Sequence, residues 1–171
     1  GVPAGTYGVQ VTSSTPVGAA ARMVRSGGEY PARSKALLHD QAWAQAALPG
    51  AVDSGLLAVP RAASLSSAVT VANSGETTSV TLSSLDGSWK QDVKVAKGSS
   101  SVVEVPAKVS AVRLNAAGRK GSSGTSHTPS GLAAATIVTA QAGGDLAGTL
   151  ISTVPAQPDA TVQAQRRILL D

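Results

Sequence analysis

The chain has 171 residues, fourteen basic against ten acidic side chains, a net charge of +4 and no cysteine. This length allows one domain of ordinary size, and the lack of cysteine excludes disulfides, thiolate metal sites and a cysteine nucleophile. Phe is absent and only two Trp and two Tyr are present, so a core must be built from Val, Leu, Ile and Ala.

The basic residues are spread along the chain and do not alternate with aromatic residues, as they do on surfaces that bind nucleic acid. We therefore expect no nucleic-acid partner, and we regard contact with an acidic polymer as the better use of the positive charge. The clusters among the basic residues are Arg22 with Arg25, Arg119 with Lys120, and Arg166 with Arg167. The last two pairs are candidate interaction residues.

Two strands are expected near the start of the chain. Tyr7–Thr12 alternates as a strand does, Thr15 and Pro16 form a turn, and Val17–Val24 is a second apolar strand. The next segment, Ser34–Leu48, is rich in Ala, Leu and Gln, which favours helix by propensity. Its all-β surroundings favour a strand instead, and we predict a strand there.

Four evenly spaced segments with period-two alternation follow in the middle of the chain. Turn residues separate them, including the Asn73–Glu76 stretch and the Asp86-Gly87 pair, which tolerate the positive φ that tight hairpins need. The pattern predicts two hairpins and a four-stranded antiparallel meander. Its strands are Ala68–Ala72, Thr77–Leu82, Trp89–Val95 and Ser101–Val105.

The two Trp residues have different expected roles. Trp89 shares a strand face with Val93 and Val95, so we expect it to pack in the core. Trp43 stands among Ala residues, where burial is harder to predict. If its side chain is exposed, Trp43 is the best candidate in the chain for an interaction hot spot.

The sequence of the last third of the chain is similar to that of the first third. Expected here are strands at Ala111–Asn115, Thr128–Val138 and Asp145–Val154, a Gly/Ser-rich surface loop over Gly118–Gly131, and a closing strand at Thr161–Leu170. Thr-Pro followed by an Ala-rich apolar segment occurs in both regions, about a hundred residues apart, which suggests repeated β modules.

The expected fold class is all-β, with antiparallel β-sandwich-like modules, a hairpin meander and little or no helix. The expected organisation is one compact unit over residues 1–171. Within it, residues 1–60 form a partial repeat, residues 61–157 a full repeat of immunoglobulin-like size, and residues 158–171 a closing strand. No apolar stretch approaches the ~20 residues of a membrane-spanning helix, so none is expected.

The sequence offers little catalytic chemistry. No Gly-x-Ser-x-Gly elbow accompanies the many serines, His127 lies in the Gly/Ser-rich loop, and His39 and Asp40 are neighbours that point to opposite faces of a strand. The acidic residues are scattered, two distant histidines do not make a metal site, and the glycines near Arg119 lack the Gly-Lys-Ser/Thr ending of a phosphate loop. We therefore expect no catalytic, cofactor-binding or metal-binding residues.

Three segments carry a resemblance to a known family: Val9–Ala21, Asp40–Ala47 and Val69–Asn73, the last opening the meander. Their order resembles an uncharacterised family of exported actinobacterial all-β repeat proteins, known as a domain of unknown function. The resemblance implies export, to the extracellular space or the cell envelope, and an all-β fold, and it implies no site residues.

The expected function is that of a non-enzymatic structural or protein-interaction module of the actinobacterial cell envelope. Its partner would be another envelope protein or a cell-wall polymer. The alternative is a carbohydrate- or cell-wall-binding module, which would use exposed aromatic side chains and basic loops.

Overall fold

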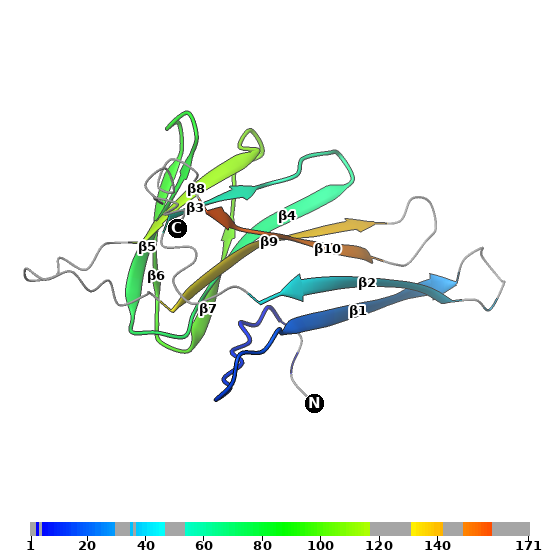
Figure 1. Cartoon of the computed structure of the whole chain (residues 1–171). Helices are drawn as coiled ribbons and strands as arrows, with labels where there is room; N and C mark the ends of the chain where they lie inside the picture. Colours follow the sequence, from blue (N-terminus) through cyan, green and yellow to red (C-terminus); the bar gives the residue numbers. More distant parts are fainter. Residues whose placement is uncertain are drawn as a thin grey trace, which may run out of the picture.

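Eleven β-strands and no helix make up the part of the chain that the computed structural model describes, namely residues 3, 5–29, 35, 37–46, 54–116, 131–141 and 149–158 (Figure 1). The strands are β1 (Ala20–Glu29), β2 (Leu37–Gln45), β3 (Ser54–Ala58), β4 (Leu65–Asn73), β5 (Thr78–Ser84), β6 (Lys90–Val95), β7 (Ser99–Glu104), β8 (Ala111–Ala116), β9 (Leu132–Gln141), β10 (Thr149–Pro155) and β11 (Gln157–Pro158). The expected all-β fold is confirmed.

Two antiparallel sheets form a sandwich. One has five strands in the order β11-β3-β8-β5-β6, and the other has four in the order β10-β9-β4-β7. The Thr136 hydroxyl of β9 crosses between the sheets and donates to the Ala58 carbonyl oxygen of β3 at 2.8 Å. None of the described residues forms a helix long and apolar enough to cross a membrane.

The core between the sheets is aliphatic. Each strand buries alternate side chains, because successive residues of a strand point to opposite faces. Only Val and Leu fill the buried cluster, with Trp89 packed against it as expected. Its members are Leu57, Val59, Val69, Val71, Val80, Leu82, Val95, Val103, Val105, Val109, Val112, Leu114 and Leu132.

The strands of the expected meander are all present, but their pairing differs from the prediction. Of these four strands, only β5 and β6 form a hairpin with each other, closed at Gly87, whose φ of 73° suits the turn. β4 instead pairs with β7 and β9 in the other sheet. The expected hairpin at Asn73–Glu76 is therefore wrong: there, and again between β6 and β7, the chain crosses from one sheet to the other.

Asn73 explains why the chain crosses there. Its side chain is 2% exposed, and its amide donates to the carbonyl oxygens of Glu76 at 2.8 Å and Val95 at 3.1 Å. Its side-chain oxygen accepts from the Gly75 amide at 2.9 Å. One buried amide thus ties the β4–β5 crossing to the end of β6, which fixes both crossings.

The first part of the chain departs from expectation at one strand. Residues 7–12 form no strand, and the second expected strand begins later, at Ala20. The strand expected within Ser34–Leu48 is confirmed as β2. Outside the described residues lie the expected loop over residues 118–130 with His127, the closing strand at Thr161–Leu170, and the basic pairs Arg119-Lys120 and Arg166-Arg167. The division into a partial and a full repeat stays a prediction.

β1 and β2 form a separate two-stranded antiparallel sheet. This hairpin lies beside β10, at the edge of the four-stranded sheet (Figure 1). It therefore stands outside the sandwich and adds a surface of its own.

Candidate functional site

One surface of the β1–β2 hairpin consists of exposed side chains. Residues directly opposite each other in an antiparallel pair share a face, and Arg22 lies opposite Trp43 while Val24 lies opposite Gln41. We call this surface the hairpin face; its members are Arg22, Val24, His39, Gln41, Trp43 and Gln45, all of them exposed. Trp43 at its centre is 58% exposed.

Exposure of more than half of a Trp residue is costly, because an indole is among the largest apolar groups a protein can bury. The other Trp of the chain, Trp89, packs against the core. On the hairpin face Arg22 lies opposite Trp43, Gln41 and Gln45 flank it along β2, and Val24 lies diagonal to it. A flat apolar ring with hydrogen-bonding groups beside it is typical of an interaction surface.

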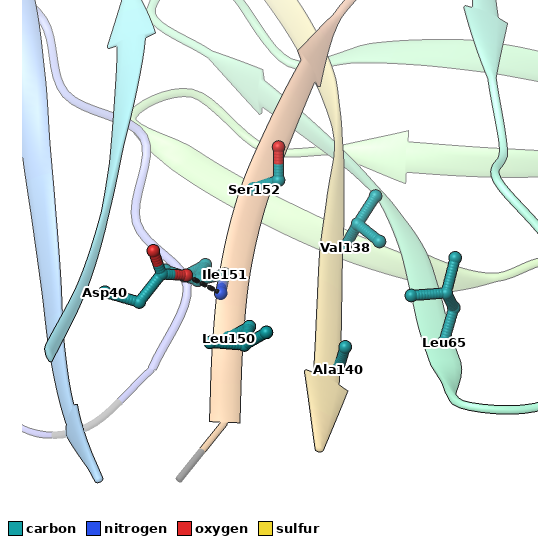
Figure 2. A pocket seen from close by; sticks show the side chains of 7 residues that line it. All are labelled: Asp40, Leu65, Val138, Ala140, Leu150, Ile151 and Ser152. Carbon is teal, nitrogen blue, oxygen red and sulfur yellow. Dashed lines mark hydrogen bonds between the residues drawn. The ribbon is translucent and has the colours of Figure 1, made fainter. Parts of the chain in front are cut away.

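Two hydrogen bonds attach the hairpin to the sandwich. The Asp40 carboxylate accepts from the Ile151 backbone amide at 2.7 Å, as Figure 2 shows. The Thr153 hydroxyl donates to the backbone carbonyl oxygen of Trp43 at 3.1 Å. Both contacts lie on β10, an edge strand with unpaired backbone groups, so β2 covers part of that edge and the hairpin face is held in a fixed place.

The opposite face of the hairpin carries Arg25 and Asp40 at one end, and next to them it is apolar and partly covered. Ala42 is buried, and Ala21, Met23 and Ala44 are half-buried. The hairpin therefore has one packed face and one solvent-exposed face, as antiparallel sheets commonly do. Trp43 lies on the solvent-exposed face.

An open cleft of about 260 Å³ lies near Asp40, where the four-stranded sheet extends past the core (Figure 2). Its lining consists of Asp40, Leu65, Val138, Ala140, Leu150, Ile151 and Ser152. Ligand pockets usually enclose roughly 300–1,000 Å³ with several convergent polar groups. This cleft is smaller and its one carboxylate already binds the Ile151 amide, so it is a weaker candidate than the hairpin face.

Titratable groups within the described residues do not gather into a reactive cluster. No three His, Asp or Glu side chains there could together hold a metal ion. His39 lies on the hairpin face, whereas Asp40 faces β10. The neighbours thus point to opposite sides, as the alternation of a strand requires.

Two pKa shifts occur in turns of the sandwich. Hydrogen bonds from Ser84 and then Ser88 lower the pKa of Asp86 to about 2. An ion pair of 2.7 Å with Glu76 raises the pKa of Lys97. Both groups are exposed and hold turn geometry, so neither shift points to catalysis.

Of the interaction residues expected from sequence, the structure places Trp43 alone. Arg119, Lys120, Arg166 and Arg167 lie outside the described residues. Sequence reasoning missed Arg22, Gln41 and Gln45 as companions of Trp43, although the alternation of Gln41, Trp43 and Gln45 was a usable signal. Arg22 could only be added once the pairing of β1 with β2 was known.

The molecule is thus a β-sandwich with an appended hairpin. Residues 1–107 match the family model described as Family of unknown function (DUF5719). Because the match covers more than half of the 171 residues, the chain belongs to this family. The expected membership of an uncharacterised family is confirmed. No curated protein and no solved structure matches the chain.

Proposed function

We propose that this chain is a non-enzymatic interaction module that works at the actinobacterial cell envelope after export, and that its hairpin face is the contact surface. The exposed Trp43 side chain carries the proposal. Source and export rest on the family resemblance of the sequence. The partner under this proposal is another envelope protein.

The energetics of interfaces support a Trp-centred surface. Hot spots are enriched in Trp and Arg, and truncating one to Ala costs about 2 kcal/mol or more of binding free energy. Trp43 and Arg22 are direct cross-strand neighbours on the hairpin face. Because two hydrogen bonds fix β2 to β10, a partner would meet this pair already in place, with little ordering cost.

The test is retention of purified envelope proteins by the immobilised chain, compared with Trp43→Ala and Val102→Ala. Val102 on β7 is a matched control, since it is apolar and 53% exposed but lies outside the hairpin. We expect a protein retained by the parent and by Val102→Ala to be lost with Trp43→Ala. Equal retention by all three chains would contradict the proposal.

A second candidate function is the binding of a carbohydrate or cell-wall polymer. It is favoured by the chemistry around Trp43, because sugars stack their apolar face on an indole while amides and guanidinium groups bind their hydroxyls. Gln41, Gln45 and Arg22 supply such groups. Binding of protein-free glycan by the parent and not by Trp43→Ala would favour this candidate over a protein partner.

A further inference from the structure

Two features near the start of the chain lack a strand partner among the described residues. Residues 5–19 form no strand, yet Tyr7–Thr12 within them has the alternation of a strand, and Val9 and Val11 are 73% and 58% exposed. In addition, β1 pairs with β2 along one edge and with no strand of the described chain along the other. Exposed Val residues and an open strand edge are both costly or hazardous in isolation.

The sequence around these features recurs later in the chain. Val2-Pro3-Ala4 followed by Val9-x-Val11 matches Val105-Pro106-Ala107 followed by Val112-x-Leu114, and both pairs of segments have the same offset, 105 − 2 = 112 − 9 = 103 residues. Each copy then continues through a Gly and an Ala-rich stretch into a ten-residue strand, β1 in the first copy and β9 in the second. Each of these strands is one arm of an antiparallel hairpin, with β2 or β10 as the other arm.

The second copy shows what such a segment does in a complete sandwich. Val112 and Leu114 of β8 are 0% exposed, and β8 lies between β3 and β5. β9 pairs with β4 on the edge that does not face β10. The partners of this closing half, β8 to β10, thus come from the preceding strands β3 to β7.

We propose that the segment 5–19 and the β1–β2 hairpin are the closing half of a second sandwich, and that their docking partner is a further copy of strands β3 to β7. Val9 and Val11 would enter its core between the copies of β3 and β5, as Val112 and Leu114 do here. β1 would add to the copy of β4. One partner thus accounts for both unpartnered features.

The present chain already shows contacts at the point where the two sandwiches would meet. The Ser100 hydroxyl of β7 donates to the Thr6 carbonyl oxygen at 3.2 Å. Gly8 packs so closely on β4 that a Cβ atom there would lie 2.6 Å from the Cβ of Ala72. These contacts hold the segment against the described sandwich just before Val9, where the second sandwich would begin.

The hairpin face stays accessible in this arrangement. When Gly18 is aligned with Gly131, Met23 takes the place of Thr136, which is buried, and Arg22 takes the place of Ala135, on the outer face of its sheet. The apolar side of the hairpin therefore turns toward the second core, and Trp43 stays outside. This proposal does not rest on the proposed function, and either can fail alone.

The test is a chain in which a copy of residues 54–103 is joined directly to Gly1, which preserves the 103-residue offset. We expect hydrogen exchange at Val9, Val11 and the free edge of β1 to slow about 100-fold or more, because these amides would join a stable sheet. Exchange in β4 and β8 serves as the internal reference.

A double substitution, Val9→Asp with Val11→Asp, supplies the control. In the fused chain it should abolish the new protection, and in the present chain it should leave the melting temperature unchanged, since both side chains are exposed. A fused copy that stays unprotected, or that makes the protein insoluble, would overturn the proposal.

Discussion

Asn73 is the residue on which two crossings between the sheets depend, since its buried amide binds backbone groups of Gly75, Glu76 and Val95. Asn73→Ala would leave two carbonyl oxygens and one amide without their partner. We expect the free energy of unfolding to fall by about 2–4 kcal/mol, measured by urea denaturation.

Asn115 on β8 offers a matched control because its side chain is exposed. Asn115→Ala should change the free energy of unfolding by less than about 0.5 kcal/mol. A loss below about 1 kcal/mol for Asn73→Ala would show that the crossings are held by other contacts.

The environment of Asp86 predicts how its carboxylate contributes to stability at acid pH. Hydrogen bonds from Ser84 and Ser88 favour its charged form, and they lower its pKa from 3.8 to about 2. A depressed pKa stabilises the fold above the unfolded value, so this contribution is complete above pH 3.8 and is lost as the pH falls through about 2. Titration of the carboxyl carbon by NMR should give a midpoint near 2.

Ser88→Ala provides the comparison for this titration, because the Ser88 hydroxyl donates to the Asp86 carboxylate at 2.8 Å. Its removal should raise the midpoint of Asp86. A midpoint of 3.8 in the parent chain would contradict the turn geometry.

At the scale of elements, the position of the β1–β2 hairpin depends on Asp40. Its bond to the Ile151 amide is charge-assisted and half-buried, and such bonds contribute more than neutral ones. Asp40→Ala should speed hydrogen exchange of the Ile151 amide about 10-fold, with β4 and β8 unchanged. Asp40→Asn keeps an acceptor oxygen and should have a smaller effect.

Gln41→Ala, at the adjacent exposed position of β2, should leave Ile151 exchange unchanged. If Asp40→Ala also leaves it unchanged, the hairpin is attached by other contacts than this bond. Loss of protection across β1 and β2 together would show that the hairpin moves as one unit.

Period-two alternation was enough to predict most strands, because each strand of a sandwich buries one face whatever its partner is. The same alternation does not say which strand pairs with which. At Asn73–Glu76 the turn residues suit a hairpin, yet the buried Asn73 amide directs the chain into the other sheet. The strand prediction for Tyr7–Thr12 is wrong for a different reason. The pattern is that of a strand, but no sheet among the described residues pairs with this segment.

For the molecule as a whole, the sandwich holds the β1–β2 hairpin in position but contributes no side chain to the hairpin face. Pairing with β9 holds β10 in the four-stranded sheet, β10 holds β2 through Ile151 and Thr153, and β2 presents Trp43. Trp43 could be singled out from the sequence, whereas its cross-strand neighbour Arg22 depends on a pairing that only the fold reveals. The stability of the sandwich and the binding of a partner should therefore respond to different substitutions.

The most direct test of the hairpin face compares dissociation constants of the parent chain, Trp43→Ala and Val102→Ala for the envelope component that the parent retains. We predict that Trp43→Ala weakens binding at least about 30-fold, which corresponds to about 2 kcal/mol, at an unchanged melting temperature. Val102→Ala should bind like the parent. Equal dissociation constants for all three chains would contradict the account.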